Sequence, residues 1–464
     1  MPKIVEYQLR PLGWENDPEE ERIRFSSLDY LAASTYNSYA IFFRLQDDSD
    51  DAKAKVVETL KSGLERTLAQ CRQLVGTIEK NPDNDDHSFV KKRDTTVKFI
   101  VKYFDHSDSI PSLSEMEANH FLSSKLGDTT QFVVDGMGYG EKPECLPSNN
   151  PVISAFQANF IPGSGLIFVT NSHHYANDAT GWANFIHQLG ENCSAIANNT
   201  PYPPWDPSNL DATRFTATDF PSASKVSGTS PPARHPNLRT HVSLLFHLPP
   251  SKASLLKTLS SPSGSWISTY DAFTSLLWRI LTRHRAPLYT PSPPASTTPL
   301  FFHGRNLFWA ASASTSPPLL TLEQITGGAP LSVLATKIRS MTASTTHEAL
   351  SKGLEAIAPV RDKTCLFTRV NSFPPLTLAV TDWREADVKG AEFGFGGEVL
   401  GYRHFFGGTV TEGLVVVYPP RGGKGEGEGC EVVVAVEREA VEGVLGDGEM
   451  GGFFEFRGVE GGVV

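Results

Sequence analysis

A proline- and serine-rich segment in the middle of the chain does most to limit how it can fold. From position 199 to about 235 apolar periodicity disappears, and the segment holds Pro201, Pro203, Pro204, Pro207, Pro221, Pro231 and Pro232. Such a segment builds no core of its own, and a chain of 464 residues exceeds what one hydrophobic core usually supports. We therefore predict an N-terminal domain at 1–198, a crossover linker at 199–238 and a C-terminal domain at 239–464.

The N-terminal part alternates between strand and helix patterns. Residues 39–45 are almost continuously apolar, which is typical of a buried strand. From 51 to 74 apolar side chains recur every three or four positions and predict a helix with one buried stripe, made of Val57, Leu60, Leu64, Leu68, Cys71 and Leu74. Residues 155–160 and 166–170 flank a Pro-Gly-Ser-Gly turn and predict a hairpin. Helical spacing resumes at Trp182.

The C-terminal part repeats this alternation. Residues 241–247 resemble a strand, and Ser268-Thr269-Tyr270-Asp271 forms a capping box ahead of a helical pattern. Residues 414–418 and 432–436 are two apolar strands joined by the glycine-rich loop 422–429. Because strands and helices alternate in both parts, the sequence predicts an α/β architecture with mixed β-sheets flanked by helices.

Charge and cysteine content exclude several classes of protein. The formal net charge is −11, and apart from Lys91-Lys92-Arg93 there is no dense basic stripe, so we expect no nucleic-acid partner. No window reaches the ~18 apolar residues of a membrane span, and the first residues lack the apolar region of a signal peptide. We therefore expect no membrane contact and a cytoplasmic location. The five cysteines form no CxxC pair, so free thiols are expected.

The segment His173-His174-Tyr175-Ala176-Asn177-Asp178 carries the first chemical signal. It connects the predicted hairpin to the next helix, and such loops often expose functional side chains on a rigid frame. His174 can serve as a general base that takes a proton from an alcohol attacking a thioester, which requires no Ser or Cys nucleophile. A metal site made of His173, His174 and Asp178 is disfavoured because adjacent histidines point apart. A pair of hydrogen-bonded loop histidines without a chemical role is the third interpretation.

Four ordered motifs resemble the signatures of the BAHD acyltransferase superfamily. His174-x-x-x-Asp178, followed by Gly181, resembles its HxxxD motif, and Glu392-Phe393-Gly394-Phe395-Gly396 resembles its Asp-Phe-Gly-Trp-Gly motif. Residues 268–273 with Trp278-Arg279 are similar to its Ser-x-x-Asp-Ala-Leu helix, and His303-Gly304-Arg305 is similar to its Asp/Asn-x-Arg turn. The resemblance covers nearly the whole chain, from about 25 to 445, and is nearest to fungal members of the trichothecene acetyltransferase kind.

The resemblance implies two similar chloramphenicol-acetyltransferase-like domains with an active-site channel at their interface. His174 would be the catalytic base in that channel. Asp178 would turn away from the substrate and pair with Arg305, and a helix N-cap is an equally good role for this carboxylate. Thr381 and Trp383 match positions that approach the reacting carbonyl, where an indole N–H can donate to the oxyanion. The alternative for Trp383 is a half-buried tryptophan that only packs.

The second motif departs from the family pattern at two positions. Glu392 replaces an aspartate and Phe395 replaces a tryptophan, so a role for an indole N–H at that second position is lost. The resemblance implies that Gly394, Phe395 and Gly396 support the fold and the CoA channel, and the two glycines keep the permissive backbone. His303 replaces an acidic residue beside Arg305.

The sequence as a whole predicts an acyltransferase that moves an acyl, and more specifically acetyl, group from acyl-CoA to a hydroxyl of a small secondary metabolite. Acyl-CoA would be a co-substrate, so no cofactor and no metal is expected. The family resemblance implies a monomer. Two other functions stay open, namely a condensation-type enzyme that forms amides or uses a carrier protein, and a diverged member that binds without catalysis.

Overall fold

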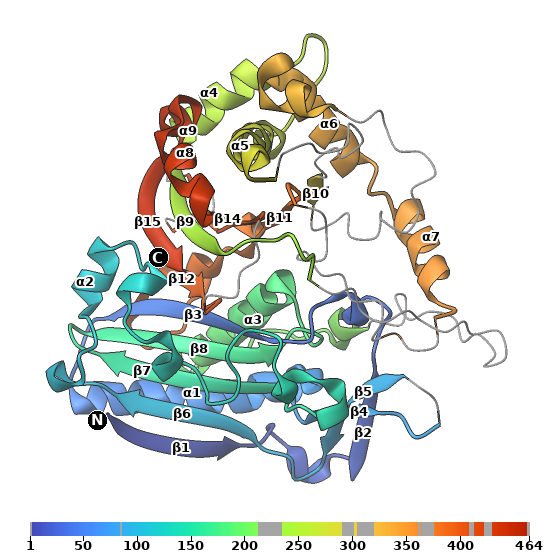
Figure 1. Ribbon diagram of the computed structural model, residues 1–464. Helices are drawn as coiled ribbons and strands as arrows, with labels where there is room; N and C mark the ends of the chain where they lie inside the picture. Colours follow the sequence, from blue (N-terminus) through green and yellow to red (C-terminus); the bar gives the residue numbers. More distant parts are fainter. Residues whose placement is uncertain are drawn as a thin grey trace.

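The computed structural model describes residues 2–83, 86–211, 234–289, 301–303, 320–360, 363, 375–407, 413–421 and 429–461. These residues form two six-stranded sheets and a three-stranded sheet, with helices packed on the sheet faces (Figure 1). The three-stranded sheet has the order β2-β5-β4 and consists of β2 (Glu20–Arg24), β5 (His87–Lys92) and β4 (Thr77–Lys80).

The first large sheet is built mainly from the N-terminal part and has the order β1-β6-β7-β8-β3-β12. Its strands are β1 (Lys3–Leu9), β6 (Val97–Tyr103), β7 (Ser154–Ile161), β8 (Gly165–His173), β3 (Tyr36–Leu45) and β12 (Gly397–His404). β6 and β7 run parallel and the other neighbours run antiparallel, so the sheet is mixed. The predicted buried strand at 39–45 is confirmed as β3, and the predicted hairpin is confirmed as β7 and β8.

Two long helices cover one face of this sheet. α1 (Asp50–Gln70) carries the predicted stripe as far as Leu68 and ends four residues before the predicted position 74, so Cys71 and Leu74 are buried beyond its end. α3 (Ala179–Asn198) begins where helical spacing resumes in the sequence. Leu60 and Leu64 of α1 and Trp182 of α3 are buried in one hydrophobic cluster with side chains of β3, β6 and β8. This cluster anchors both ends of the loop between β8 and α3.

The opposite face is covered by the segment from 104 to 137, which includes the short helix α2 (Leu113–Ala118). The sequence from 112 to 125 predicts a short helix with a polar face, and the structure realises only its first part. After Ala118 the chain turns, and His120 and Phe121 both adopt positive φ angles of 55° and 54°. Phe121 thereby turns inward and packs on Phe42 of β3, and this burial ends the helix early.

The second large sheet has the order β10-β11-β13-β14-β9-β15. Its strands are β10 (Phe301–His303), β11 (Leu378–Asp382), β13 (Leu414–Val417), β14 (Cys430–Glu437), β9 (His241–Leu248) and β15 (Glu455–Gly461). β10, β11 and β13 run parallel and the others antiparallel. The strands predicted at 241–247, 414–418 and 432–436 are confirmed as β9, β13 and β14.

Helices lie on the outer face of the second sheet, around α5 (Thr269–Arg285). The others there are α4 (Pro250–Ser260), α6 (Leu331–Ala343), α8 (Val441–Gly446) and α9 (Gly448–Phe453), while α7 (His347–Ile357) follows α6 in the chain. The capping box predicted for the start of α5 is confirmed: the Ser268 Oγ accepts the Asp271 N–H, and the Asp271 carboxylate accepts the Ser268 N–H. Among the helices described, none combines the length and apolar character needed to cross a bilayer.

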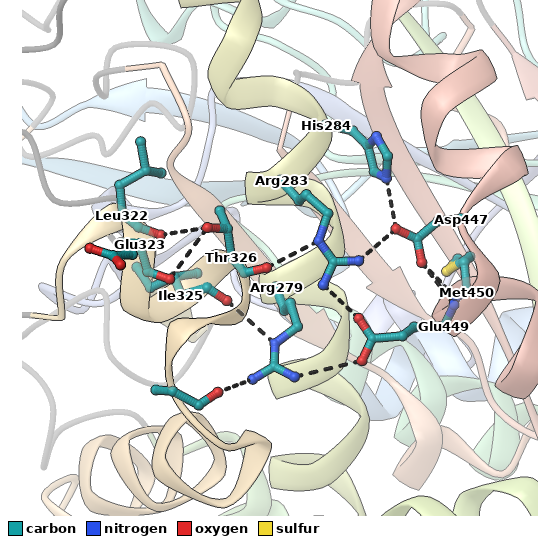
Figure 2. A network of polar contacts seen from close by, with 11 residues as sticks. Arg279, Arg283, His284, Leu322, Glu323, Ile325, Thr326, Asp447, Glu449 and Met450 are labelled. Carbon is teal, nitrogen blue, oxygen red and sulfur yellow. Dashed lines mark hydrogen bonds and ion pairs between the residues drawn. The ribbon is translucent and has the colours of Figure 1, made fainter.

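A network of charged side chains fixes α9 and the turn at 324–328 to α5 (Figure 2). Arg283 lies 2.8 Å from the Asp447 carboxylate and 2.6 Å from that of Glu449, and its Nε donates to the Thr326 carbonyl. His284 Nε2 lies 2.7 Å from the same Asp447 carboxylate, which also caps α9. One carboxylate thus receives two side chains of α5 and two backbone amides of α9, so the helices are held in a fixed relation.

The two large sheets share one hydrophobic cluster. Leu245, Val416, Val433 and Ala435 lie on the strands of the second sheet, yet they belong to the cluster beneath the first sheet. In addition, β12 comes from beyond position 239 and pairs with β3 of the first sheet (Figure 1). The first sheet is therefore not built from residues 1–198 alone, because β3 pairs with β8 on one side and with a strand from the C-terminal part on the other.

Cys71, Cys145, Cys193 and Cys430 are buried free thiols, as predicted. Cys365 lies outside the described residues.

Candidate active site

His174 lies in the short loop between β8 and α3. β8 ends at His173, and His174 continues the ladder with its backbone N–H, which donates to the Thr35 carbonyl at 2.8 Å. The loop ends at Asp178, the N-cap of α3. The imidazole is half-buried. The predicted position of His174, on a strand-to-helix connection, is confirmed.

The hydrogen bond of the His174 ring fixes which nitrogen carries the proton. His174 Nδ1 lies 3.1 Å from the backbone carbonyl oxygen of Asn177. A carbonyl oxygen can only accept, so Nδ1 must carry the hydrogen. In the neutral ring the lone pair is then on Nε2. Nε2 is therefore the nitrogen of His174 that could accept a proton.

His173 is a structural residue. Its side chain is fully buried, its Nε2 donates to the Cys145 carbonyl at 2.9 Å, and its Nδ1 accepts the Tyr175 N–H at 3.2 Å. Burial lowers the pKa of His173 to about 4. Because both ring nitrogens are engaged, His173 has no lone pair left for a metal ion.

Asp178 is exposed and faces the start of α3. Its Oδ1 accepts the Gly181 N–H at 2.8 Å, which is the geometry of a helix N-cap. The cap joins the end of the loop to the first turn of the helix. The predicted partner, Arg305, lies outside the described residues, so the Asp178–Arg305 pair stays a prediction.

Thr381 and Trp383 lie at the end of β11 and are joined by a hydrogen bond. The Trp383 indole Nε1–H donates to the Thr381 Oγ1 at 2.8 Å. The Trp383 backbone N–H donates to the Val417 carbonyl at 2.9 Å, which ties it to the neighbouring strand. Thus the indole N–H, which the resemblance assigns to the oxyanion, is already engaged. Since the Thr381 hydroxyl accepts this bond, its own hydrogen is the donor left at this position.

His404 was not marked by any sequence motif, yet it lies between the two halves of the site. It is at the end of β12, is 1% exposed, and its Nε2 donates to the Asn37 Oδ1 at 3.1 Å. Its ring centroid is 5.9 Å from that of Trp383 and 4.9 Å from that of Tyr39. Burial, with a smaller effect from His174, holds the pKa of His404 well below its usual value.

Strand register explains why these residues meet. His404 pairs with Tyr39, and Asn37 pairs with Ser172, two residues before His174. Side chains two apart on a strand share a face, so Ser172, His174, Asn37 and His404 all lie on the face that Trp383 contacts through Tyr39. A polar end of this sheet face thus meets the end of β11. His404 lies here because β12 pairs with β3. No local sequence pattern predicts this pairing, so sequence reasoning missed His404.

The second sequence motif lies against α3 and leads into β12. Gly394 and Gly396 have φ angles of 71° and 77°, in the region that favours glycine. A Cβ on Gly394 would lie 2.6 Å from the Ser194 Cα of α3, so the backbone can approach this closely only because the side chain is absent. Phe395 packs on Phe43 of β3 with the ring centroids 5.6 Å apart. These contacts give the segment a role in joining the two parts of the chain.

Comparison with known proteins assigns the chain to a family. Residues 35–193 match the family described as trichothecene 3-O-acetyltransferase-like N-terminal domain. The acetyltransferase FGR3 of Gibberella zeae is 46% identical over an alignment of 483 residues, gaps included, which spans 99% of this chain and 95% of that protein. The chain belongs to the BAHD acyltransferase superfamily. The acyltransferase easC of Emericella nidulans is 23% identical over an alignment that covers 94% of this chain and 96% of that protein.

Two solved structures have the same fold. F. graminearum TRI101 complexed with coenzyme A and T-2 mycotoxin aligns with a TM-score of 0.72 at 18% identity, covering 94% of this chain and 100% of that one. Vinorine synthase aligns with a TM-score of 0.64 at 18% identity, covering 96% of both chains. The predicted two-domain α/β fold with mixed sheets is therefore confirmed.

The departures from the BAHD pattern at Glu392 and Phe395 are accommodated in different ways. Glu392 is exposed, so a longer carboxylate fits without displacing a neighbour. Phe395 fills its position through contacts with Phe43 and Phe393 and needs no hydrogen-bond partner. Whether Gly394, Phe395 and Gly396 line a CoA channel stays a prediction.

Proposed function

We propose that this protein transfers an acetyl group from acetyl-CoA to a hydroxyl of a small secondary metabolite, with His174 as the general base. The observation that carries the proposal is the hydrogen bond from His174 Nδ1 to the Asn177 carbonyl, because it leaves the lone pair on Nε2. Support for the donor and the acceptor class comes from the acetyltransferase relative and from the TRI101 structure with coenzyme A and T-2 mycotoxin.

The chemistry needs only a base and an oxyanion donor. His174 Nε2 takes the proton of the acceptor hydroxyl as its oxygen bonds to the thioester carbonyl carbon, and the carbonyl electrons move onto the oxygen. The tetrahedral intermediate then collapses, the C–S bond breaks, and the proton on Nε2 passes to the leaving sulfur. The products are the ester and free CoA. Because the thioester is already activated, the protein needs no nucleophile, cofactor or metal of its own.

We assign the oxyanion donor to the Thr381 hydroxyl. The Trp383 N–H donates to its oxygen at 2.8 Å, so this oxygen is held in place and its hydrogen is directed away from the indole. A donor fixed in this way requires little reorganisation when charge develops on the substrate oxygen. Trp383 then acts through Thr381.

In this proposal Asp178 fixes the end of the loop to the first turn of α3, and Arg305 is its predicted partner. Acyl-CoA and the acceptor meet at His174, in a channel between the N-terminal domain at 1–198 and the C-terminal domain at 239–464, and Gly394, Phe395 and Gly396 support the CoA side. The protein acts as a cytoplasmic monomer.

The proposal is tested by steady-state turnover of acetyl-CoA with a panel of hydroxylated fungal metabolites. Turnover is measured from the release of the CoA thiol, and the product is identified by its mass. An ester with one added acetyl group is expected. Transfer only from an acyl carrier protein, or formation of an amide, would replace the proposal by a condensation-type function. Binding of acetyl-CoA without turnover of any acceptor would favour a non-catalytic binding protein.

A further inference from the structure

Asn177 connects a buried serine to the catalytic histidine. Its backbone carbonyl accepts the hydrogen bond of His174 Nδ1 at 3.1 Å, and its side-chain Oδ1 accepts the Ser172 hydroxyl at 3.0 Å. Ser172 lies on β8 and is 4% exposed, so its position is set by the sheet. The two hydrogen bonds of Asn177 therefore relate the His174 ring to a fixed point of the first sheet.

The start of α3 holds Asn177 from the other side. A Cβ on Gly181 would lie 3.1 Å from the Asn177 Cβ, so the glycine leaves just enough room for this side chain. The next residue, Asp178, caps the same helix. Asn177 is thus confined between the Ser172 hydroxyl and the first turn of α3.

We propose that Ser172 and Asn177 are positioning residues that hold His174 with its proton on Nδ1 and its lone pair on Nε2. Without the Ser172–Asn177 hydrogen bond, the Asn177 peptide can rotate and its carbonyl leaves the His174 ring. The ring then also adopts the other tautomer, in which Nε2 carries the hydrogen and cannot act as a base. This inference rests on the proposed role of His174. The HxxxD motif names neither residue.

The test is a double-mutant cycle in the full-length enzyme. Ser172→Ala and Asn177→Ala each remove one partner of the bond, and each is expected to lower kcat about tenfold with an unchanged KM for acetyl-CoA. The double variant is also expected to lose about tenfold, because both changes break the same bond, whereas independent effects would multiply to about a hundredfold. Asn177→Asp keeps an acceptor oxygen for Ser172 and is expected to retain most of the kcat.

Ser154→Ala is the matched control. Ser154 pairs with Ser172 across β7 and β8, is 1% exposed, and donates its hydroxyl to the Leu74 carbonyl at 2.7 Å. This change also removes one buried serine hydrogen bond from the same sheet, yet the bond leads away from His174. We expect wild-type kcat. If Ser154→Ala and Ser172→Ala lower kcat equally, the effect is one of general stability and the inference is wrong.

A second readout needs no acceptor. In ¹⁵N NMR of the free enzyme, with the His174 signals assigned by comparison with His174→Ala, Nδ1 is expected to carry the proton in the wild type, and both tautomers are expected in Ser172→Ala. An unchanged tautomer in Ser172→Ala would overturn the positioning role. Wild-type kcat in His174→Ala would instead overturn the proposed function, so the two failures are distinguishable.

Discussion

The hydrogen bond between Trp383 and Thr381 gives a prediction about which of them stabilises the oxyanion. We expect Thr381→Val, which keeps the shape of the side chain but removes the hydroxyl, to lower kcat by about 10²–10³. Trp383→Phe removes the bond that orients this hydroxyl, which is 2.8 Å long in the structure. A hydrogen bond of this type contributes about 0.5–1.5 kcal/mol, so kcat should fall by about 2- to 12-fold.

Phenylalanine is a suitable replacement because the Trp383 ring also packs against other rings. Its centroid lies 5.7 Å from that of Tyr418 and 6.2 Å from that of Phe406, and a six-membered ring keeps part of these contacts. The double variant is expected to be no slower than Thr381→Val, since Trp383 acts through Thr381.

The assay is release of the CoA thiol under saturating acetyl-CoA and acceptor, with the melting temperature of each variant measured in parallel. The opposite ranking would refute the reasoning. If Trp383→Phe lost about 10²–10³ in kcat while Thr381→Val lost little, the indole N–H itself would be the oxyanion donor and would have to leave Thr381 in the complex.

Two further predictions concern stability. Burial lowers the pKa of His173 from 6.5 to about 4, so protonation of this residue favours the unfolded chain. The stability that neutral His173 contributes is complete above pH 6.5 and is lost as the pH falls towards 4. The loss is about 3 kcal/mol at ~1.4 kcal/mol per pH unit. Urea unfolding from pH 4 to 8 measures this loss, and an equally steep loss in His173→Gln would assign it to other groups. Arg285 and Glu437 form a buried ion pair at 2.7 Å, with side chains 1% and 0% exposed. Glu437→Gln leaves the Arg285 charge uncompensated and should lower the free energy of unfolding by about 3–5 kcal/mol. A loss below about 1 kcal/mol, the range of exposed pairs, would contradict the burial of this pair.

Local patterns in the sequence were sufficient for the elements that carry the site. The stripe of α1, the hairpin of β7 and β8 and the capping box of α5 depend on residues close in the sequence. The hairpin and the capping box are found as predicted, and the stripe is found as far as Leu68, because α1 ends at Gln70. The same local reading put His174 on a strand-to-helix loop. The helix expected at 112–125 was too long because burial of Phe121 against Phe42, a contact distant in the sequence, turns the chain after Ala118.

The features of the site that the sequence did not predict depend on contacts between distant segments or on the orientation of single groups. His404 joins the site only because β12 pairs with β3, although 367 positions separate Asn37 from His404. The role of Asn177 depends on the direction of its carbonyl, and the engagement of the Trp383 N–H depends on a side-chain rotamer. Residue type and spacing specify neither of these.

The central claim, that His174 is the general base, is tested most directly by the kcat of His174→Ala together with its affinity for CoA measured by calorimetry. We predict a loss of about 10²–10⁴ in kcat with unchanged CoA affinity, because the side chain accepts a proton rather than binding the donor. A variant that turns over at the wild-type rate would contradict the account.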